Sequence, residues 1–296
     1  MMLQVAVLSG KGGTGKTVVT AAISDILPGR KGFADCDVEA ANLALLLGPR
    51  EKSRIPFFGL KKATVQKEIC QECGLCTGVC HFGAIRQDPS GIITIDPIRC
   101  EGCAVCREAC PAGAISLSDH QNGEIILADT DHGPLVYAEL HPGSGNSGLL
   151  VHEVKKVALK ESDGRDLLII DGPPGIGCPV ISTLSGINAA IFVTEPGIAA
   201  LHDLRRLVAV SAGFSLSSFV VINRADLHPG FAKEIELFCK EKGIPVIGKI
   251  PFDPTVIESV REGVPVTRRE CAASHELKNI GRRLMEELLH EPGRSG

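Results

Sequence analysis

The chain has 296 residues, 44% of them hydrophobic, and a formal net charge of −4. That apolar content is enough for a packed core, so a disordered or fibrous protein is excluded. The sequence holds no basic run and no apolar stretch of membrane-spanning length, so it predicts neither a nucleic-acid partner nor a membrane anchor. Leu3–Ser9 leads straight into a glycine-rich loop, as a first β-strand does and a signal peptide does not.

The N-terminal part alternates strands and helices, and this pattern then stops. The predicted elements are a strand at Leu3–Ser9, a loop at Gly10–Gly15, a helix from about Lys16 to Leu27, a strand at Phe33–Asp35 and a helix near Asn42–Leu47. From about Lys61 to Leu117 both periodicities give way to closely spaced cysteines.

The alternation resumes after the cysteines. We expect strands at Leu135–Leu140, Leu167–Ile170, Ala190–Thr194, Phe219–Asn223 and Pro245–Ile250, with helices at Leu149–Lys160 and from about Ser274 onward. Such alternation predicts an α/β fold with a mostly parallel sheet and helices on both faces. The cysteine-rich residues 61–118 are therefore expected to be an insertion into a single nucleotide-binding domain made of residues 1–60 and 119–296.

A phosphate-binding loop follows the first strand. Gly10-Lys11-Gly12-Gly13-Thr14-Gly15-Lys16-Thr17 satisfies G-x-x-x-x-G-K-[ST]. In this pattern backbone N–H groups surround the phosphates, Lys16 reaches the β- and γ-phosphates, and the Thr17 hydroxyl holds Mg²⁺. The alternative is a glycine-rich turn without function, which the strand–loop–helix context disfavours.

The second lysine of the loop makes the pattern more specific. With Lys11, the loop resembles the deviant Walker A motif of the superfamily that contains MinD, ParA, Mrp and the nitrogenase iron protein. The resemblance implies an ATPase that dimerises on ATP, with Lys11 reaching the phosphates bound by the partner subunit. A cation supplied there would stabilise the charge that develops during phosphoryl transfer.

Two further segments resemble the switches of that superfamily. By this match Asp37 orients the attacking water, Asp35 lies near Mg²⁺, and Asp171 is the outer-shell Mg²⁺ partner at the end of an apolar strand. The segment Gly172–Gly175 then corresponds to switch II. Each short motif alone would fit a solvated turn, and their order behind the P-loop favours the functional interpretation.

The base-recognition segment leaves two nucleotides open. Asn223 and Arg224 close one predicted strand and Pro251 closes the next, where the superfamily binds the base. Asn223-Arg224-Ala225-Asp226 also resembles the guanine-reading motif of G proteins. The deviant lysine favours ATP, whereas these four residues do not exclude GTP.

The insertion contains an internal repeat with an offset of thirty residues. Cys70, Cys73, Cys76 and Cys80 recur as Cys100, Cys103, Cys106 and Cys110, and both runs match the spacing of bacterial two-cluster ferredoxins. In that arrangement the fourth cysteine of each run binds the other cluster. The expected [4Fe–4S] ligands are Cys70, Cys73, Cys76 and Cys110 for cluster 1, and Cys100, Cys103, Cys106 and Cys80 for cluster 2.

Zinc is the alternative metal, and its sites usually have a longer gap between cysteine pairs. One residue departs from the ferredoxin pattern, because His81 follows the first run where Pro111 follows the second. An imidazole at this place tunes the nearby cluster or simply points to solvent. Cysteines spaced for metal binding, without a signal peptide, indicate a reducing cytoplasmic compartment.

Four cysteines lie outside the two runs. They are Cys36, Cys178, Cys239 and Cys271, of which Cys239 and Cys271 are most simply small buried residues. Cys178 follows Asp171 by seven residues, where the nitrogenase iron protein carries a ligand of its dimer-bridging cluster. A second cysteine for such a site is not evident, so an ordinary thiol is the competing interpretation.

These motifs support three hypotheses about function. The first is an ATP-gated electron carrier that acts on a partner protein, which two permanently bound clusters favour. The second is an iron–sulfur or metallocofactor assembly factor, although no C-x-x-C occurs near the C-terminus. The third is a MinD-like positioning ATPase with redox-sensing clusters, which the acidic residues Glu286, Glu287 and Glu291 of the last helix disfavour. Because the insertion follows Asp35–Asn42 and precedes the strand to Asp171, both its ends are expected beside nucleotide-responsive elements.

Overall fold

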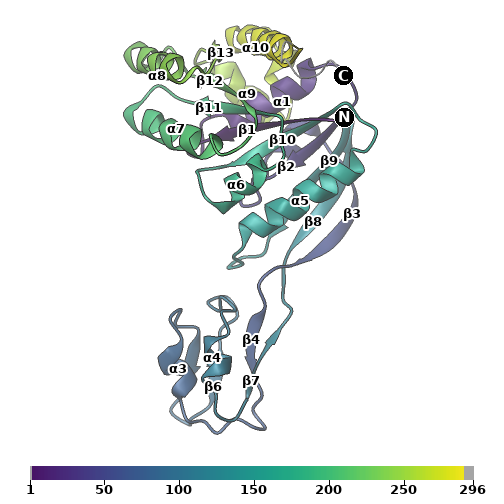
Figure 1. Ribbon diagram of the computed structural model, residues 1–296. Coiled ribbons are helices and arrows are strands. Elements are labelled where there is room, and N and C mark those ends of the chain that lie inside the picture. Colours follow the sequence, from purple (N-terminus) through teal and green to yellow (C-terminus); the bar gives the residue numbers. More distant parts are fainter. Residues whose placement is uncertain (1, 290–296) are drawn as a thin grey trace.

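The structure, a computed structural model, describes residues 2–289. It has two lobes that an extended two-stranded ribbon joins (Figure 1). The larger lobe, the body, contains one sheet and most of the helices, and the smaller lobe contains the two cysteine runs. Each lobe has its own hydrophobic core.

The body is built on a nine-stranded sheet in the order β13-β12-β11-β1-β10-β2-β9-β8-β3. All neighbours from β13 to β9 are parallel, and β8 and β3 add an antiparallel edge. The strands are β1 Leu3–Ser9, β2 Lys31–Asp35, β3 Arg50–Phe58, β8 Gln121–Thr130, β9 Gly133–Leu140, β10 Leu167–Pro174, β11 Ala189–Thr194, β12 Ser217–Asn223 and β13 Val246–Ile250.

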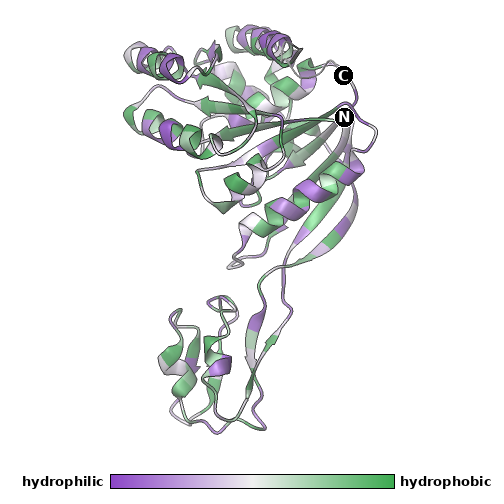
Figure 2. Cartoon of the chain, viewed as in Figure 1, coloured by the Kyte–Doolittle hydropathy of each residue, from purple (hydrophilic) through white to green (hydrophobic). Residues whose placement is uncertain are grey.

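Helices cover both faces of this sheet because successive strand residues point to opposite sides. Ala6 and Leu8 of β1 pack under α5 to α8, while Val5 and Val7 pack under α1, α2 and α10. Figure 2 shows hydrophobic strands beneath helices whose outer faces are hydrophilic. The body helices are α1 Lys16–Ile26, α2 Leu43–Leu47, α5 Ser147–Glu161, α6 Cys178–Leu184, α7 Ile198–Ser211, α8 Pro229–Lys242, α9 Pro254–Arg261, the 3₁₀ helix η1 Val266–Arg268 and α10 Ala272–Leu289.

The predicted α/β fold with a mostly parallel sheet is confirmed. The last helix forms as expected, and its stripe of Leu277, Ile280, Leu284 and Leu288 is buried in the core. Glu291 lies outside the described residues. Among residues 2–289 no helix is both long and apolar enough to cross a bilayer.

The sequence did not predict the antiparallel edge strands β3 and β8. β3 is exposed along most of its length and carries alternating charges, which form ion pairs with the neighbouring strands. Arg54, for example, lies 2.9 Å from Glu124 of β8 and 3.4 Å from Glu139 of β9. Charged edge strands resist pairing with other sheets, and they lack the apolar periodicity that identifies buried strands.

The small lobe consists of two short two-stranded antiparallel sheets and two short helices. Its strands β4 Lys62–Val65 and β7 Ile115–Ser118 pair with each other, as do β5 Ile85–Gln87 and β6 Ile93–Ile95. The helices are α3 Leu75–Val79 and α4 Val105–Glu108. Cysteines supply part of the small core, together with alanine and isoleucine.

The lobe does not attach where the sequence order suggested. β3 and β8 carry it at the edge of the sheet, with β9 and β2 between them and β10. Both ends of the insertion therefore lie at the edge of the sheet, away from β10, which contains Asp171. The reason is that the unpredicted strands β3 and β8 stand between the body and the small lobe. The expected tether to nucleotide-responsive elements is wrong for the ends of the insertion.

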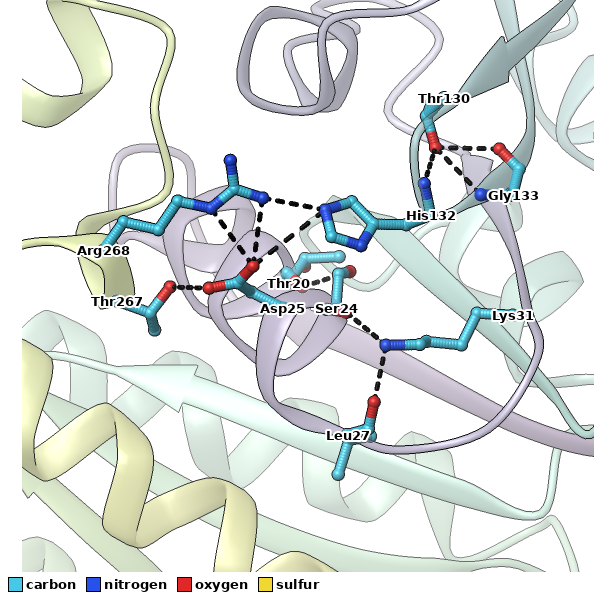
Figure 3. A network of polar contacts seen from close by, with 10 residues as sticks. All are labelled: Thr20, Ser24, Asp25, Leu27, Lys31, Thr130, His132, Gly133, Thr267 and Arg268. Carbon is cyan, nitrogen blue, oxygen red and sulfur yellow. Dashed lines mark hydrogen bonds and ion pairs between the residues drawn. The ribbon is translucent and has the colours of Figure 1, made fainter.

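A polar network fixes the far end of β8 to the body (Figure 3). Asp25 of α1 accepts hydrogen bonds from Thr267 at 2.6 Å and from Arg268 at 3.1 Å. Arg268 also lies 2.9 Å from His132 in the β8–β9 turn. This network holds the turn against α1 and η1, so β8, which returns from the small lobe, ends at a fixed point.

Candidate functional site

The P-loop lies between β1 and α1, at the carboxyl edge of the parallel strands. The first amides of α1 have no side-chain cap, so their N–H groups remain available to an anion. Gly15 has φ +93°, and a Cβ there would come within 2.4 Å of the Asn223 amide nitrogen. That amide donates to the Thr14 carbonyl at 2.8 Å and so supports the loop from β12.

A cavity of about 530 Å³ opens beside this loop, large enough for a nucleotide. The P-loop, the segment after β2, and helices α2 and α9 surround it. Its lining residues are Gly12, Gly13, Gly15, Lys16, Thr17, Val18, Asp37, Glu39, Ala40, Asn42, Leu45, Leu46, Pro174 and Val260.

Thr17 and Asp171, the two residues that were predicted to serve Mg²⁺, are hydrogen-bonded to each other. The Thr17 hydroxyl donates to one Asp171 oxygen at 2.7 Å, and the Thr20 hydroxyl donates to the other at 2.9 Å. Burial raises the pKa of Asp171 to about 6. A buried carboxylate beside a hydroxyl at the phosphate loop is a donor set that suits a hard cation such as Mg²⁺.

Asp37 faces the P-loop lysine. Its carboxylate lies 3.7 Å from the Lys16 ammonium, and both side chains line the cavity. Burial raises the pKa of Asp37, while Lys16 acts in the opposite direction. A phosphate that drew Lys16 toward itself would leave this carboxylate free to accept a proton or to orient water.

Asp35 is fully buried, and both of its carboxylate oxygens accept hydrogen bonds from backbone N–H groups. One accepts from the Asp37 backbone N–H at 3.1 Å, and the other accepts from the Leu43 N–H at 2.9 Å. Burial and the nearby Asp171 charge raise the pKa of Asp35 well above its usual range. Asp35 therefore ties the segment after β2 to the start of α2, and it lies directly beside Asp171 in the sheet.

Lys11 is paired within its own chain. Its ammonium lies 3.2 Å from Glu195, which follows β11 and also pairs with Arg224 at 2.6 Å. Glu195 was not among the residues that the sequence singled out. Its role depends on two strand ends meeting, and its local sequence carries no signal of that.

The predicted base-recognition residues stand apart from the cavity. Asn223 supports the P-loop, Arg224 pairs with Glu195, and neither lines the cavity; nor does Pro251. Asp226 accepts from the Phe252 backbone N–H at 2.7 Å, so one of its oxygens is engaged within the chain. Sequence reasoning missed several apolar lining residues, namely Val18, Ala40, Leu45, Leu46 and Val260.

In the small lobe the structure brings the cysteines together as two groups of four. Cys70, Cys73, Cys76 and Cys110 line one small cavity. Cys80, Cys100, Cys103 and Cys106 line a second small cavity. These are the groups that the exchange of the fourth cysteine predicts.

Backbone amides point at several of these sulfurs. The N–H groups of Ala84 and Ala114 donate to Cys80 and Cys110 at 3.3 Å, at matching places in the two repeats. Burial raises the pKa of Cys76 and Cys106, and the other cysteines of each group raise it further. Four thiols with amide donors form a donor set that fits an iron–sulfur cluster. Within residues 2–289 no three His, Cys, Asp or Glu side chains are placed to hold a single metal ion.

The cysteines outside the two groups differ in exposure. Cys36 and Cys239 are buried, Cys271 is half-buried at the start of α10, and Cys178 is exposed as the first residue of α6. His81 is exposed, and its ring meets the edge of Phe82. No bridging partner for Cys178 is seen in the part of the chain that the structure describes.

Residues 142–148 connect the two lobes by contact, and we call this segment the strap. A Cβ on Gly143 would come within 2.4 Å of Ile98, and one on Gly145 within 3.4 Å of the Glu101 carboxylate. At the other end, a Cβ on Gly148 would lie 3.0 Å from Cys178. The strap thus touches both the segment around Cys100 and the helix that follows switch II.

Comparisons with known proteins agree with this geometry. The family model described as the CobQ/CobB/MinD/ParA nucleotide binding domain matches residues 5–266. The chain is 29% identical to an uncharacterized protein of Methanocaldococcus jannaschii, over 97% of this chain and 98% of that protein. It is 24% identical to an iron–sulfur cluster carrier protein of the same organism, over 96% of this chain and 84% of that protein.

Solved structures show the same fold. The septum site-determining protein MinD of Pyrococcus horikoshii, complexed with Mg-ADP, superposes with a TM-score of 0.57 at 21% identity. The match covers 98% of both chains.

Proposed function

This chain belongs to the CobQ/CobB/MinD/ParA nucleotide-binding family, and from this premise we propose that it is an ATPase that gates electron transfer to a partner protein through two [4Fe–4S] clusters. The main support is the combination of a P-loop body with a lobe in which two cavities are each lined by four cysteines. A contact segment, the strap, lies between them.

The body residues divide the work on ATP. Lys16 would exchange its ion pair with Asp37 for the β- and γ-phosphates, and Thr17 with Asp171 would hold Mg²⁺. Asp37, once released, would orient the attacking water. Lys11 would leave Glu195 and stabilise the charge on phosphates bound by a second copy of the chain.

The cysteines would hold the redox groups. Cys70, Cys73, Cys76 and Cys110 would bind cluster 1, and Cys80, Cys100, Cys103 and Cys106 would bind cluster 2. When bound, the clusters supply one-electron transfer at low potential. Such thiolate sites persist in a reducing compartment, which supports a cytoplasmic location.

A second function is favoured by a separate observation. Proteins named iron–sulfur cluster carrier proteins share 24% identity with nearly the whole chain. The chain would then bind and deliver clusters or assemble a metallocofactor, with ATP controlling release. In that case the lobe cysteines would lose their iron to an acceptor protein.

Linkage separates the two functions. If ATP state and cluster redox state are coupled, cluster reduction must change ATP affinity by the same factor as ATP changes cluster affinity for the electron, typically about 5- to 150-fold. We expect different ATP affinities for oxidised and dithionite-reduced protein without air. The Asp37→Ala variant should bind ATP without hydrolysing it, so its ATP affinity can be measured at equilibrium. Equal affinities would refute electron gating, and ATP-dependent loss of iron to an apoprotein would then favour the carrier function.

A further inference from the structure

Lys62 is a buried charged residue of the small lobe. Its side chain is only 3% exposed, and its ammonium donates to the Cys100 backbone carbonyl at 2.5 Å. Cys100 belongs to the second cysteine group, with Cys80, Cys103 and Cys106. A positive charge that is shielded from water acts strongly on its surroundings, because solvent and salt screen it little.

The first cysteine group has no counterpart of this charge. Lys62 precedes Cys70 by eight residues, and Ile92 precedes Cys100 by eight, so the two occupy equivalent places in the repeat. The two strand pairs match too, since Val65 pairs with Ile115 as Ile95 pairs with Ile85. The repeat is therefore broken at one position, where a buried cation bonds to the Cys100 carbonyl of the second group and the equivalent residue of the other repeat is an isoleucine.

Backbone N–H donors to the cysteine sulfurs are also more numerous in the second group than in the first. The N–H groups of Ala63 and Gly102 both donate to the Cys100 sulfur at 3.4 Å, and that of Ala84 donates to Cys80. Among the described residues, the first group receives one such bond, from Ala114 to Cys110. Glu101 is the one carboxylate in the lining of the second cavity, and it reaches toward Gly145 of the strap, where it is half exposed.

From this asymmetry, and resting on the proposed function, we infer that Lys62 makes cluster 2 the more easily reduced of the two clusters. A nearby cation and N–H donors to the sulfurs stabilise the extra negative charge of the reduced state and raise the reduction potential. A low-potential one-electron donor would supply the electron, and no bond or proton need change. The electron would then reside mainly on cluster 2.

The place of cluster 2 in the lobe determines which segment of the body the electron would lie near. The segment of Cys100 is the part of the lobe that touches the strap, through Ile98 and Glu101. An electron that settles there lies next to the segment that continues to Cys178 and switch II. Lys62 would thus act as a positioning residue that sets the order of the two clusters.

The test is a potentiometric titration followed by electron paramagnetic resonance on reconstituted protein. A Cys110→Ala variant, which lacks a ligand of cluster 1, assigns the remaining wave to cluster 2. We expect wild-type cluster 2 to titrate at the higher potential. Lys62→Met should lower the reduction potential of cluster 2 by about 59 mV, which is a factor of about ten in the equilibrium constant for one-electron reduction. The potential of cluster 1 should change less.

Two further variants complete the test. Lys62→Arg should restore the wild-type value, and Ile92→Lys should raise the wave of cluster 1 instead. An unchanged cluster 2 wave in Lys62→Met overturns the inference. If Lys62→Met does not take up iron, Ile92→Lys decides, and an unchanged cluster 1 wave overturns it equally. Failure of the proposed function would be seen in the wild type before any variant is compared, because the reconstituted protein would then contain no iron and no sulfide.

Discussion

The Lys11 ammonium lies 3.2 Å from the carboxylate of Glu195 in the same chain. Glu195 also holds Arg224, while the Lys11 side chain remains 42% exposed. Lys11 is therefore positioned by a partner that it can leave, since an exposed ion pair is worth no more than about 1 kcal/mol. Phosphates bound by a second subunit would compete easily for it.

Removing this lysine should separate binding from hydrolysis. Lys11→Ala should bind ATP nearly as the wild type does, but ATP-driven dimerisation should be lost, and kcat should fall by roughly 10³-fold, as when a cation supplied in trans is removed. Light scattering and phosphate release measure the two effects. Lys16→Ala is the matched variant, and it should lose nucleotide binding itself. Normal hydrolysis by Lys11→Ala would refute the trans role.

The grouping of the cysteines can be tested by metal content. Reconstituted wild type should carry about eight iron and eight sulfide per chain. Cys80→Ala and Cys106→Ala should affect the same cluster although the two residues come from different runs, because both line the second cavity. Cys76→Ala and Cys110→Ala should affect the other cluster. Spectra that instead group Cys80 with Cys76 would contradict this assignment, and about one zinc without sulfide would end it.

Sequence reasoning succeeded where a pattern is local. The P-loop, the apolar strand before Asp171 and the cysteine runs each carry their own signal, and the elements around them lie within a few residues of the predicted bounds. Sequence reasoning did not predict β3, because the charged residues of this strand, such as Arg54, show no apolar periodicity and find many of their partners on neighbouring strands. Glu195 was missed for the same reason, since its contacts with Lys11 and Arg224 exist only once distant strand ends meet.

Lys155 should make stability depend on alkaline pH. It is buried between α5 and α6, where its ammonium donates to the carbonyls of Thr183 and Ser185. Burial lowers the pKa of Lys155 from 10.5 to about 8. The unfolded chain therefore binds this proton more tightly, and the free energy of unfolding rises as the pH increases through this range.

The measurement compares wild type with Lys155→Met by urea unfolding. Between about pH 7.5 and about pH 10, the wild type should gain roughly 2 kcal/mol relative to the variant, since one pKa unit is about 1.4 kcal/mol. The two lost hydrogen bonds affect the variant at both pH values and cancel in this difference. A constant difference across the range would show that Lys155 is not destabilised by its burial.

The strap should carry the coupling between nucleotide and lobe. Gly143→Val places a side chain against Ile98 at a residue with φ +73°, so the strap must move. We expect ATP binding and iron content to be kept, while the difference in ATP affinity between oxidised and reduced protein falls toward zero. Gly145→Ala is the control, because its Cβ meets only ordinary contacts at 3.4 Å and 3.8 Å. Undiminished coupling in Gly143→Val would remove the strap from the pathway.

The antiparallel pairing of β3 with β8 has a consequence for the design of the whole chain. Phe58 and Gln121 face each other in register at the point where the ribbon leaves the sheet. The chain therefore departs and returns at neighbouring positions, as it does at the tip of any hairpin, where insertions are tolerated best. A two-residue Asn-Gly turn in place of residues 59–120 would close the hairpin, and the strands that carry the P-loop would need no rearrangement. The cysteine-containing lobe should thus be removable as a unit, and the same junction should accept a different insertion.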